Sequence, residues 1–303
     1  MSVSIIIPTR NQHLILDQAL RSIAQSNTKD LGRVEILVID NQSDEQDSQA
    51  YLKNLPANAL SWGLENVSVI DFNEPFNFSK MNNTAVEQAR GDVLCFLNND
   101  VEVISEDWLG QLVKEASHRE TGCVGALLFY PDNTVQHAGV VMGMGTIADH
   151  AYVKMPREST LDHPYFQEKR ICTAITGACL AIRREVFDSV GGFENTLAVA
   201  FNDIDLCLKV QKAGYHNIFL PSVKLYHHES VSRGRGNKSP EAKARHQQEI
   251  RHMQKTWGAS VRSDPHWVCE KNQPTLGDNG FPYLIKRRLK KKQVVTFRYR
   301  AIR

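Results

Sequence analysis

The 303-residue sequence lacks several features that would place it in a special class of protein. Its longest apolar runs, such as residues 93–97, fall far short of the roughly 18 residues that a membrane-spanning helix needs. It has no Cys-x-x-Cys pair, and no basic, apolar leader with a small-residue cleavage site. A composition of 42% hydrophobic and 23% charged residues excludes disorder, collagen and coiled coil for the whole chain. We therefore expect a globular, cytoplasmic protein with reduced thiols.

The net charge of +2 hides an uneven distribution of charge along the chain. Residues 286–303 contain nine Lys or Arg and no acidic residue, whereas the remainder carries 27 basic and 34 acidic residues. Such a tail suits attraction to anionic lipid, at about 1 kcal/mol per basic residue, binding of nucleic acid, or a solvated terminus. Because the remainder is acidic, we expect no nucleic-acid partner.

The first half of the sequence alternates short β-branched runs with amphipathic helical stretches. The expected strands are residues 3–7, 34–39, 67–70 and 93–97, and the expected helices are residues 14–25, 46–52, 80–89 and 107–117. Continuous apolar strands joined by helical crossovers are typical of parallel sheets buried on both faces. The sequence therefore predicts an α/β fold with a Rossmann-like, mainly parallel central sheet and helices on both faces.

The second half has a less regular pattern. Residues 129–168 lack a sustained hydrophobic period and are interpreted as an excursion or a lid. The elements expected after it are regular structure at residues 171–182, a helix at 203–213, a strand at 223–226, a mobile loop at 230–240 and a helix at 241–257. The segment Gly143–Ala148 matches a dinucleotide-binding fingerprint, but no helix follows it before Pro156, so we reject that interpretation. No internal repeat and no compelling second domain is present.

Polar residues follow three of the expected strands, namely Pro8–Asn11, Asp40–Asp44 and Asn98–Asp100. Ligands of doubly wound sheets bind at the carboxyl ends of the strands. A lone carboxylate such as that of Asp100 is more often a turn or cap residue. One or two carboxylates nevertheless suffice to hold a divalent cation when phosphate oxygens complete its coordination. Asp100 is therefore a candidate metal ligand.

Two further sites in the second half have both an ordinary and a chemical interpretation. Asp203 stands at an expected helix start, where it could cap the helix or act as a general base. His227 and His228 follow a strand, where either could be a buried or turn residue or a metal ligand beside Asp100. The other histidines of the excursion, His137, His150 and His163, lack the spacing of zinc ligands.

Taken in order, these motifs resemble the glycosyltransferase family 2 enzymes with the GT-A fold. Phe96–Asp100 resembles the D-x-D element of that family, and Asn202–Cys207 resembles its catalytic E-D type motif. Val3–Asn11 resembles the opening strand of the family, and Val38–Asp44 resembles its nucleoside-binding turn. Asn77–Asn83 with Ala89–Asp92 resembles the helix before the metal motif. Thr176–Cys179 with Gly191–Phe193 resembles the acceptor side. Tyr226–Gly234 is similar to a signature of bacterial members that build surface polysaccharides. The resemblance covers about residues 3–260.

The resemblance implies an inverting, metal-dependent glycosyltransferase of bacterial surface-polysaccharide biosynthesis. The enzyme would move a sugar from a UDP-, dTDP- or GDP-linked donor to a saccharide or lipid-linked glycan acceptor, with manganese or magnesium as cofactor. A GT-A domain would span residues 1–260, with a nucleotide-binding half at 1–128 and an acceptor-binding half at 129–260. Residues 261–303 would form an extension whose basic tail could touch the inner face of the membrane.

The resemblance also assigns roles to individual residues. Asp203 would be the general base, and Asp100 would bind the metal together with His227 or His228. The nucleotide would contact Pro8, Thr9, Arg10, Asn11, Asp40, Asn41, Lys80, Asn83, Asn98 and Asn99, and the donor or acceptor sugar would contact Gly177, Ala178, Asn202 and Asp205. Asn98 and Asn202 stand where many relatives have acidic residues, which leaves room for Glu102 at the metal. These two departures also motivate an alternative, a non-catalytic module that binds a nucleotide sugar or saccharide.

Overall fold

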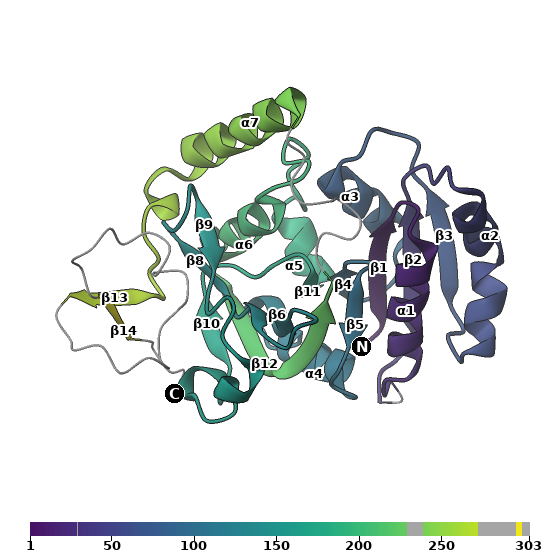
Figure 1. Cartoon of the computed structure of the whole chain (residues 1–303), viewed down its shortest axis with the longest axis horizontal. Helices are drawn as coiled ribbons and strands as arrows, with labels where there is room; N and C mark the ends of the chain where they lie inside the picture. The colour runs from purple at the N-terminus through teal and green to yellow at the C-terminus, as the bar shows by residue number, and fades with distance from the viewer. Residues whose placement is uncertain (29, 229–238, 272–294, 299–303) are drawn as a thin grey trace.

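The computed structural model describes the whole chain except residues 29, 229–238, 272–294 and 299–303 (Figure 1). The first part contains β1 (Val3–Thr9), α1 (His13–Ala24), β2 (Val34–Asp40), α2 (Gln46–Ser61), β3 (Val67–Asp71), α3 (Phe78–Gln88), β4 (Val93–Leu97), β5 (Val101–Val103) and α4 (Trp108–Ala116). The second part contains β6 (Thr121–Phe129), β7 (Val135–His137), β8 (Val140–Met142), β9 (Ala148–His150), the 3₁₀ helices η1 (Arg157–Thr160) and η2 (Pro164–Phe166), β10 (Arg170–Cys172), β11 (Cys179–Arg183), α5 (Arg184–Ser189), α6 (Asn202–Lys212), β12 (His216–His227), α7 (Pro240–Trp257), η3 (Gly258–Val261), β13 (Val268–Lys271) and β14 (Val295–Arg298).

A central sheet runs through the molecule in the order β10-β12-β6-β11-β4-β1-β2-β3, with β5 added beside β12 and β7 beside β6. The neighbours β4, β1, β2 and β3 are parallel, as are β6 and β12. Strand β11 runs antiparallel between β4 and β6. The mainly parallel sheet predicted from the sequence is confirmed.

Helices cover both faces of this sheet and bury two separate apolar cores. On one face, α1, α2 and α4 contribute residues such as Leu20, Leu55 and Trp108. On the other face, α3, α5 and α6 contribute residues such as Phe78 and Leu206. The strands are buried from both sides, which explains why their sequences are continuously apolar rather than alternating.

Most expected elements of the first half end within two residues of their predicted bounds, and α2 is the exception. The prediction ended this helix at Leu52, but it continues through Pro56 to Ser61. Leu55 and Ala59 extend the buried stripe that begins at Leu52. Burial of this stripe offsets the hydrogen bond that a proline removes from a helix interior.

The irregular region 129–168 is a packed excursion rather than an open lid. Tyr152 lies at its centre, with ring contacts to His163, Tyr165, Phe166 and Trp267. Gly143 and Gly145 have positive φ angles in the connection between β8 and β9. The segment that matched the dinucleotide-binding fingerprint is therefore the loop of a β-hairpin. Most of the basic tail and most of the loop 230–240 lie outside the described residues.

The described helices and cysteines agree with the expectations from composition. None of the described helices is long and apolar enough to cross a membrane. Cys95, Cys123, Cys172, Cys179 and Cys207 are buried and unpaired by disulfides.

Candidate active site

The ends of β1 and β2 form one polar rim of the sheet. The carboxylate of Asp40 accepts hydrogen bonds from the main-chain N–H and the hydroxyl of Ser43. The buried side chain of Asn41 donates to the carbonyl oxygens of Phe72 and Glu74, which holds the chain after β3 against the end of β2. The predicted nucleotide residues Asp40 and Asn41 therefore belong to one bonded corner of the sheet.

Asn11 ties the turn after β1 to the turn after β2. Its main-chain N–H donates to the Ser43 hydroxyl at 2.7 Å, and its side-chain oxygen accepts from the main-chain N–H of Asp44. Its side-chain amide donates to the Asp44 carboxylate, which holds the pKa of that carboxyl below its usual value. Asn11, Gln12 and Gln42 all adopt left-handed backbone conformations, which non-glycine residues keep only where the surrounding structure imposes them.

An open cavity of about 750 Å³ adjoins this corner, within the size range of small-molecule sites. It lies between the carboxyl ends of β2 and β3 and helix α2. Its lining residues are Asp40, Gln42, Ser43, Asp44, Gln49, Leu52, Lys53, Pro56, Val69, Asp71 and Asn73.

The end of β4 meets the end of β12 at a second polar cluster. The Nε2 atom of His227 lies 3.1 Å from Oδ1 of Asp100 and 3.2 Å from the side-chain amide nitrogen of Asn98. Asp100 and His227 are only 4% and 9% exposed. The structure thus brings together residues that are far apart in the sequence, as the metal prediction requires.

The side chain of His228 has a different partner, although its main-chain N–H donates to the carbonyl oxygen of Asp100 at 2.9 Å. Its Nε2 atom lies 3.1 Å from Oε2 of Glu102, which also accepts from the side-chain amide of Gln18. The sequence left open which of the two histidines, and whether Glu102, accompanies Asp100. The geometry favours His227, because His228 and Glu102 form a separate pair.

The donor set at Asp100 and His227 suits a divalent cation that also binds phosphate oxygens. Among the described residues, there is no group of three or more His, Cys, Asp or Glu side chains that could hold a metal ion. One carboxylate and one imidazole, with the Asn98 amide beside them, are nevertheless oxygen and nitrogen ligands of the kind that Mn²⁺ and Mg²⁺ accept. A bound diphosphate would supply the remaining ligands.

Asp203 lies in the first turn of α6. The N-cap position of this helix is held by Phe201, in a left-handed conformation and without a side-chain cap bond, so Asp203 is not the N-cap residue, although its carboxylate bonds a first-turn N–H. The Asp203 carboxylate accepts from the main-chain N–H of Gly177 at 2.8 Å and from that of Ile204 at 2.8 Å. These bonds fix a partly exposed carboxylate at the start of a helix.

Asp205 occupies a different environment from Asp203. Its side chain is 1% exposed, pairs with Lys209 at 3.0 Å and accepts from the Trp257 indole N–H at 2.8 Å. This burial argues against the predicted contact of Asp205 with a sugar. We infer that Asp205 anchors α7 to α6.

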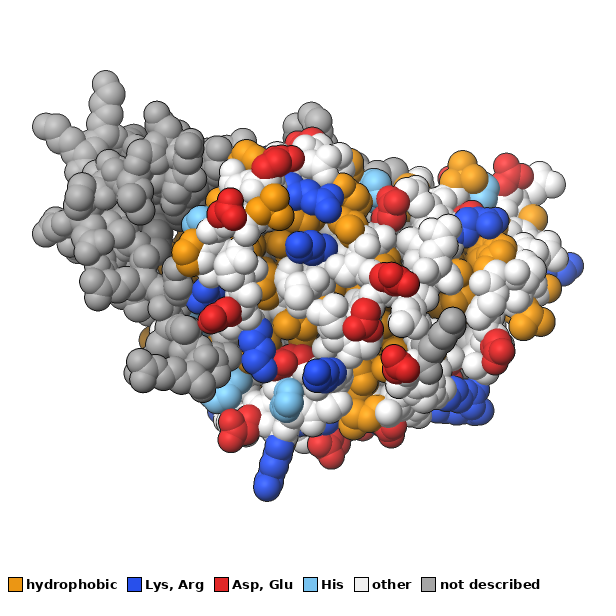
Figure 2. Space-filling view, turned by 90° about the horizontal axis from the view of Figure 1, so that it is seen from below, with side chains coloured by type: hydrophobic (Ala, Val, Ile, Leu, Met, Phe, Trp, Pro, Cys, Tyr) orange, Lys and Arg blue, Asp and Glu red, His pale blue; other side chains and the backbone are white. Residues whose placement is uncertain are grey.

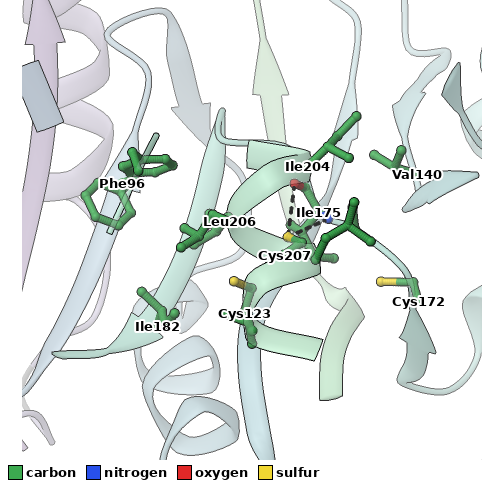
Figure 3. Close-up of a cluster of buried hydrophobic side chains, with 14 of the residues drawn as sticks. Phe96, Cys123, Val140, Cys172, Ile175, Ile182, Ile204, Leu206 and Cys207 are labelled. Carbon is green, nitrogen blue, oxygen red and sulfur yellow. Dashed lines mark hydrogen bonds between the residues drawn. The ribbon is translucent and has the colours of Figure 1, made fainter. Parts of the chain in front are cut away.

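A cysteine on the same helix fixes the loop that carries Gly177. The sulfur of Cys207 accepts a hydrogen bond from the main-chain N–H of Ile175 and donates to its carbonyl oxygen (Figure 3). Figure 3 shows these bonds inside a cluster of apolar side chains that includes Ile204 and Leu206. Cys207 ends the segment Asn202–Cys207 that resembles the catalytic motif, but no role for it follows from the sequence, because a lone buried cysteine has no distinctive spacing.

The two halves of the site are joined by main-chain contacts at the end of β4. The N–H of Asn98 donates to the carbonyl oxygen of Ala178, the residue after Gly177. The path from Asp203 to Asp100 therefore runs through Gly177–Ala178, Asn98 and His227. Both carboxylates lie at the same edge of the sheet.

Five other predicted nucleotide residues have clear partners. Thr9 accepts from the buried amide of Asn99, and Arg10 lies 3.6 Å from Asp44. Lys80 pairs with Glu74 at 2.7 Å. Both ends of the Asn83 amide bind the 193–195 loop, so Asn83 holds that loop in place rather than facing an open site.

Comparisons with known sequences agree with the motifs. A model of the family described as Glycosyl transferase family 2 matches residues 4–191, and one described as Glycosyl transferase family group 2 matches residues 113–276. The uncharacterized protein y4gI of Sinorhizobium fredii is 43% identical over 87% of this chain and 28% of its own length. The O-antigen biosynthesis protein RfbC of Myxococcus xanthus is 36% identical over 79% of this chain and 18% of its own length. This chain thus spans less than a third of either relative.

Comparisons with solved structures show the GT-A fold. GalNAc-T7, solved with UDP, GalNAc and Mn²⁺, superposes with a TM-score of 0.62 at 19% identity, over 78% of this chain and 46% of that chain. The mannosyltransferase PcManGT of Pyrobaculum calidifontis, solved with GDP-Man and Mn²⁺, superposes with a TM-score of 0.53 at 18% identity, over 86% and 72%. Since the family model matches more than half of the chain, the protein belongs to glycosyl transferase family 2.

Proposed function

We propose that this protein transfers a sugar from a nucleotide-sugar donor to a saccharide acceptor with inversion at the anomeric carbon. The observation that carries this proposal is the convergence of the Asp100–His227 pair and the Asp203 carboxylate on one sheet edge, through Asn98 and Ala178. An inverting transfer needs a site for the leaving diphosphate on one side of the sugar and a proton acceptor on the other.

Three groups of residues would take part in the transfer, namely the nucleoside corner, the base Asp203 and the metal pair Asp100 and His227. The corner formed by Asp40, Asn41 and the turn at Asn11 would hold the nucleoside. Asp203 would take the proton of the acceptor hydroxyl as that oxygen attacks the anomeric carbon, which breaks the bond to the diphosphate oxygen. The bonds from Gly177 and Ile204 would keep the carboxylate oriented while leaving it lone pairs for this proton.

Asp100 and His227 would hold a divalent cation, which when bound neutralises negative charge that develops on the leaving diphosphate. Support comes from the donor set itself and from two neighbours that were solved with Mn²⁺.

The acceptor class is suggested by two relatives. RfbC is named as an O-antigen biosynthesis protein, and a Mycobacterium tuberculosis relative, 30% identical over 38% of this chain and 39% of its own length, is named as an N-acetylglucosaminyl-diphospho-decaprenol L-rhamnosyltransferase. We therefore propose a saccharide or lipid-linked glycan acceptor in surface-polysaccharide synthesis, reached from the cytoplasm. The donor could carry UDP, dTDP or GDP.

Contact with an anionic membrane would depend on the basic tail. Figure 2 shows one face of the described part, where acidic and basic side chains are interspersed, so this face offers no uniformly basic surface to lipid. Removing residues 286–303 should abolish association with anionic vesicles while leaving transfer to a soluble acceptor intact.

A donor panel read by the release of nucleoside diphosphate, with and without Mn²⁺, tests the proposed activity. We expect turnover with one donor in the presence of metal, and loss of metal-dependent donor affinity in Asp100→Ala. Glu102→Ala is the matched control, because Glu102 pairs with His228 instead. Metal-independent turnover, or unchanged metal-linked affinity in Asp100→Ala, would refute the ligand assignment.

The alternative of a non-catalytic binding module is motivated by Asn98 and by Asn202. The buried side-chain nitrogen of Asn202 has no hydrogen-bond partner among the residues that the structure describes, although its oxygen accepts from the main-chain N–H of Asp203. A donor bound without transfer or slow hydrolysis, over the whole panel, would favour this alternative.

A further inference from the structure

The amide of Gln136, in β7, touches His227 on the side opposite Asp100. Its oxygen Oε1 lies 2.6 Å from Nδ1 of His227, and its nitrogen Nε2 donates to the main-chain carbonyl oxygen of His227 at 3.3 Å. Gln136 is 5% exposed. One side chain therefore contacts both the ring and the backbone of the same residue.

These two contacts require a proton on Nδ1 of His227. A carbonyl oxygen can only accept, so the end of the Gln136 amide that faces it must be the NH₂ group. The other end is then the oxygen, which can only accept from Nδ1–H. The main-chain bond thereby fixes the orientation of the amide, and the amide fixes the proton on Nδ1.

A neutral imidazole with its proton on Nδ1 has a lone pair on Nε2. That lone pair accepts from the side-chain amide nitrogen of Asn98 at 3.2 Å and lies 3.1 Å from Oδ1 of Asp100, so a bound cation would replace the hydrogen bond from Asn98. Two acceptors, Nε2 and the carboxylate, thus lie side by side, an arrangement that suits a shared cation. With the opposite tautomer, Nε2–H would donate to Asp100 and block that position.

We propose that Gln136 is a positioning residue that keeps Nε2 of His227 available as a metal ligand. This inference rests on the proposed metal role of Asp100 and His227. It assigns a function to a residue outside every motif of the sequence, since Gln136 lies in the excursion between β6 and β10. Partners on the second nitrogen of a ligating histidine commonly change metal affinity by about 10–100-fold when they are removed.

The first test measures the tautomer itself and requires no metal. Long-range ¹H–¹⁵N spectra of histidine-labelled, metal-free protein should show a proton on Nδ1 of His227, and in Gln136→Leu the proton should move to Nε2. An Nδ1 proton that persists in Gln136→Leu, or that is missing from the wild-type protein, overturns the inference.

The second test measures the binding of Mn²⁺ alone by calorimetry. Gln136→Leu should weaken binding about 10–100-fold, whereas Gln136→Glu, which still accepts from Nδ1–H, should stay much closer to wild type. Gln211→Leu is a matched control, since Gln211 lies on α6 beside Cys172 and His266. Equal affinity of wild type and Gln136→Leu would overturn the inference, whereas a wild-type protein that binds no Mn²⁺ would overturn the metal assignment whatever the tautomer spectra show.

Discussion

The carboxylate of Asp203 accepts a hydrogen bond from the main-chain N–H of Gly177 at 2.8 Å. The next residue, Ala178, accepts from the main-chain N–H of Asn98, whose side chain lies 3.2 Å from His227. The carboxylate on α6 and the polar cluster after β4 are therefore fixed relative to each other through rigid main chain at the sheet edge. A proton acceptor and a leaving-group site must keep a set separation for a displacement to work.

Asp203→Asn should lower kcat by about 10²–10⁴-fold, the usual contribution of a general base. Donor affinity should change little, because the amide oxygen still accepts one of the two bonds that Gly177 and Ile204 donate to different oxygens of the carboxylate. Asp205→Asn is the control. It removes the buried charge beside Lys209 and should lower the melting temperature, while kcat of the folded fraction stays near wild type. Full turnover in Asp203→Asn would remove this residue from the base role.

Cys207→Val should affect the Asp203 carboxylate indirectly, through the loop that carries Gly177. It leaves the main-chain N–H and C=O of Ile175 without their sulfur partner, at a cost of about 1–3 kcal/mol in unfolding free energy. Because Ile175 begins the loop that carries Gly177, we also expect a lower kcat with little change in KM. Cys207→Ser, which keeps a donor and an acceptor, should lie between wild type and valine. Urea unfolding and steady-state kinetics measure both effects, and an unchanged kcat in the valine variant would show that the loop is held by other contacts.

The sheet and the strand-end residues could be predicted from the sequence because both follow local rules. Runs such as residues 93–97 are apolar throughout only when helices cover both faces, and parallel strands carry their ligands at the carboxyl ends. The predicted end of α2 was wrong because the continuation of the helix through Pro56 depends on the burial of Leu55 and Ala59, which is a matter of tertiary packing.

The arrangement within the site could be predicted only in part. The sequence named both Asp203 and Asp205, but the difference between them comes from Trp257, which lies 52 residues away and binds Asp205 alone. The choice between His227 and His228 likewise depends on pairing across β5 and β12, where the register opposes His227 to Val101 and Tyr226 to Glu102. Such contacts have no signal in residue spacing.

Ser43→Ala should weaken donor binding rather than the chemical step. The Ser43 hydroxyl bonds both Asp40 and the main-chain N–H of Asn11, so its loss removes one of the links between the two turns of the proposed nucleoside corner, while the bonds of the Asn11 side chain to Asp44 remain. We expect KM for the donor to rise about tenfold, which corresponds to roughly 1.4 kcal/mol, with kcat nearly unchanged. Ser61→Ala, at the exposed end of α2, is the control and should leave both constants unchanged. A fall in kcat without a change in KM would contradict the assignment.

The buried histidine His137 should make the stability of the fold depend on pH. Its side chain is fully buried, its Nε2 accepts from the main-chain N–H of Gly139, and its Nδ1 lies 2.7 Å from Nδ1 of His150. Burial is the main cause that holds the pKa of His137 well below the ordinary value of 6.5, and the neighbouring His150 and His227 add to it. Below pH 6.5 this histidine therefore binds a proton in the unfolded chain but stays neutral in the folded chain. As a result, the free energy of unfolding falls as pH falls through that value. For this group the unfolding free energy changes by at most about 1.4 kcal/mol per pH unit.

Urea unfolding at pH 7.5 and 5.5 measures how much unfolding free energy is lost between these values. The loss should be smaller in His137→Gln than in wild type, although the variant is less stable at both pH values. His118→Gln, at an exposed position, is the control and should keep the wild-type loss. An identical loss in His137→Gln would assign the pH dependence to other groups.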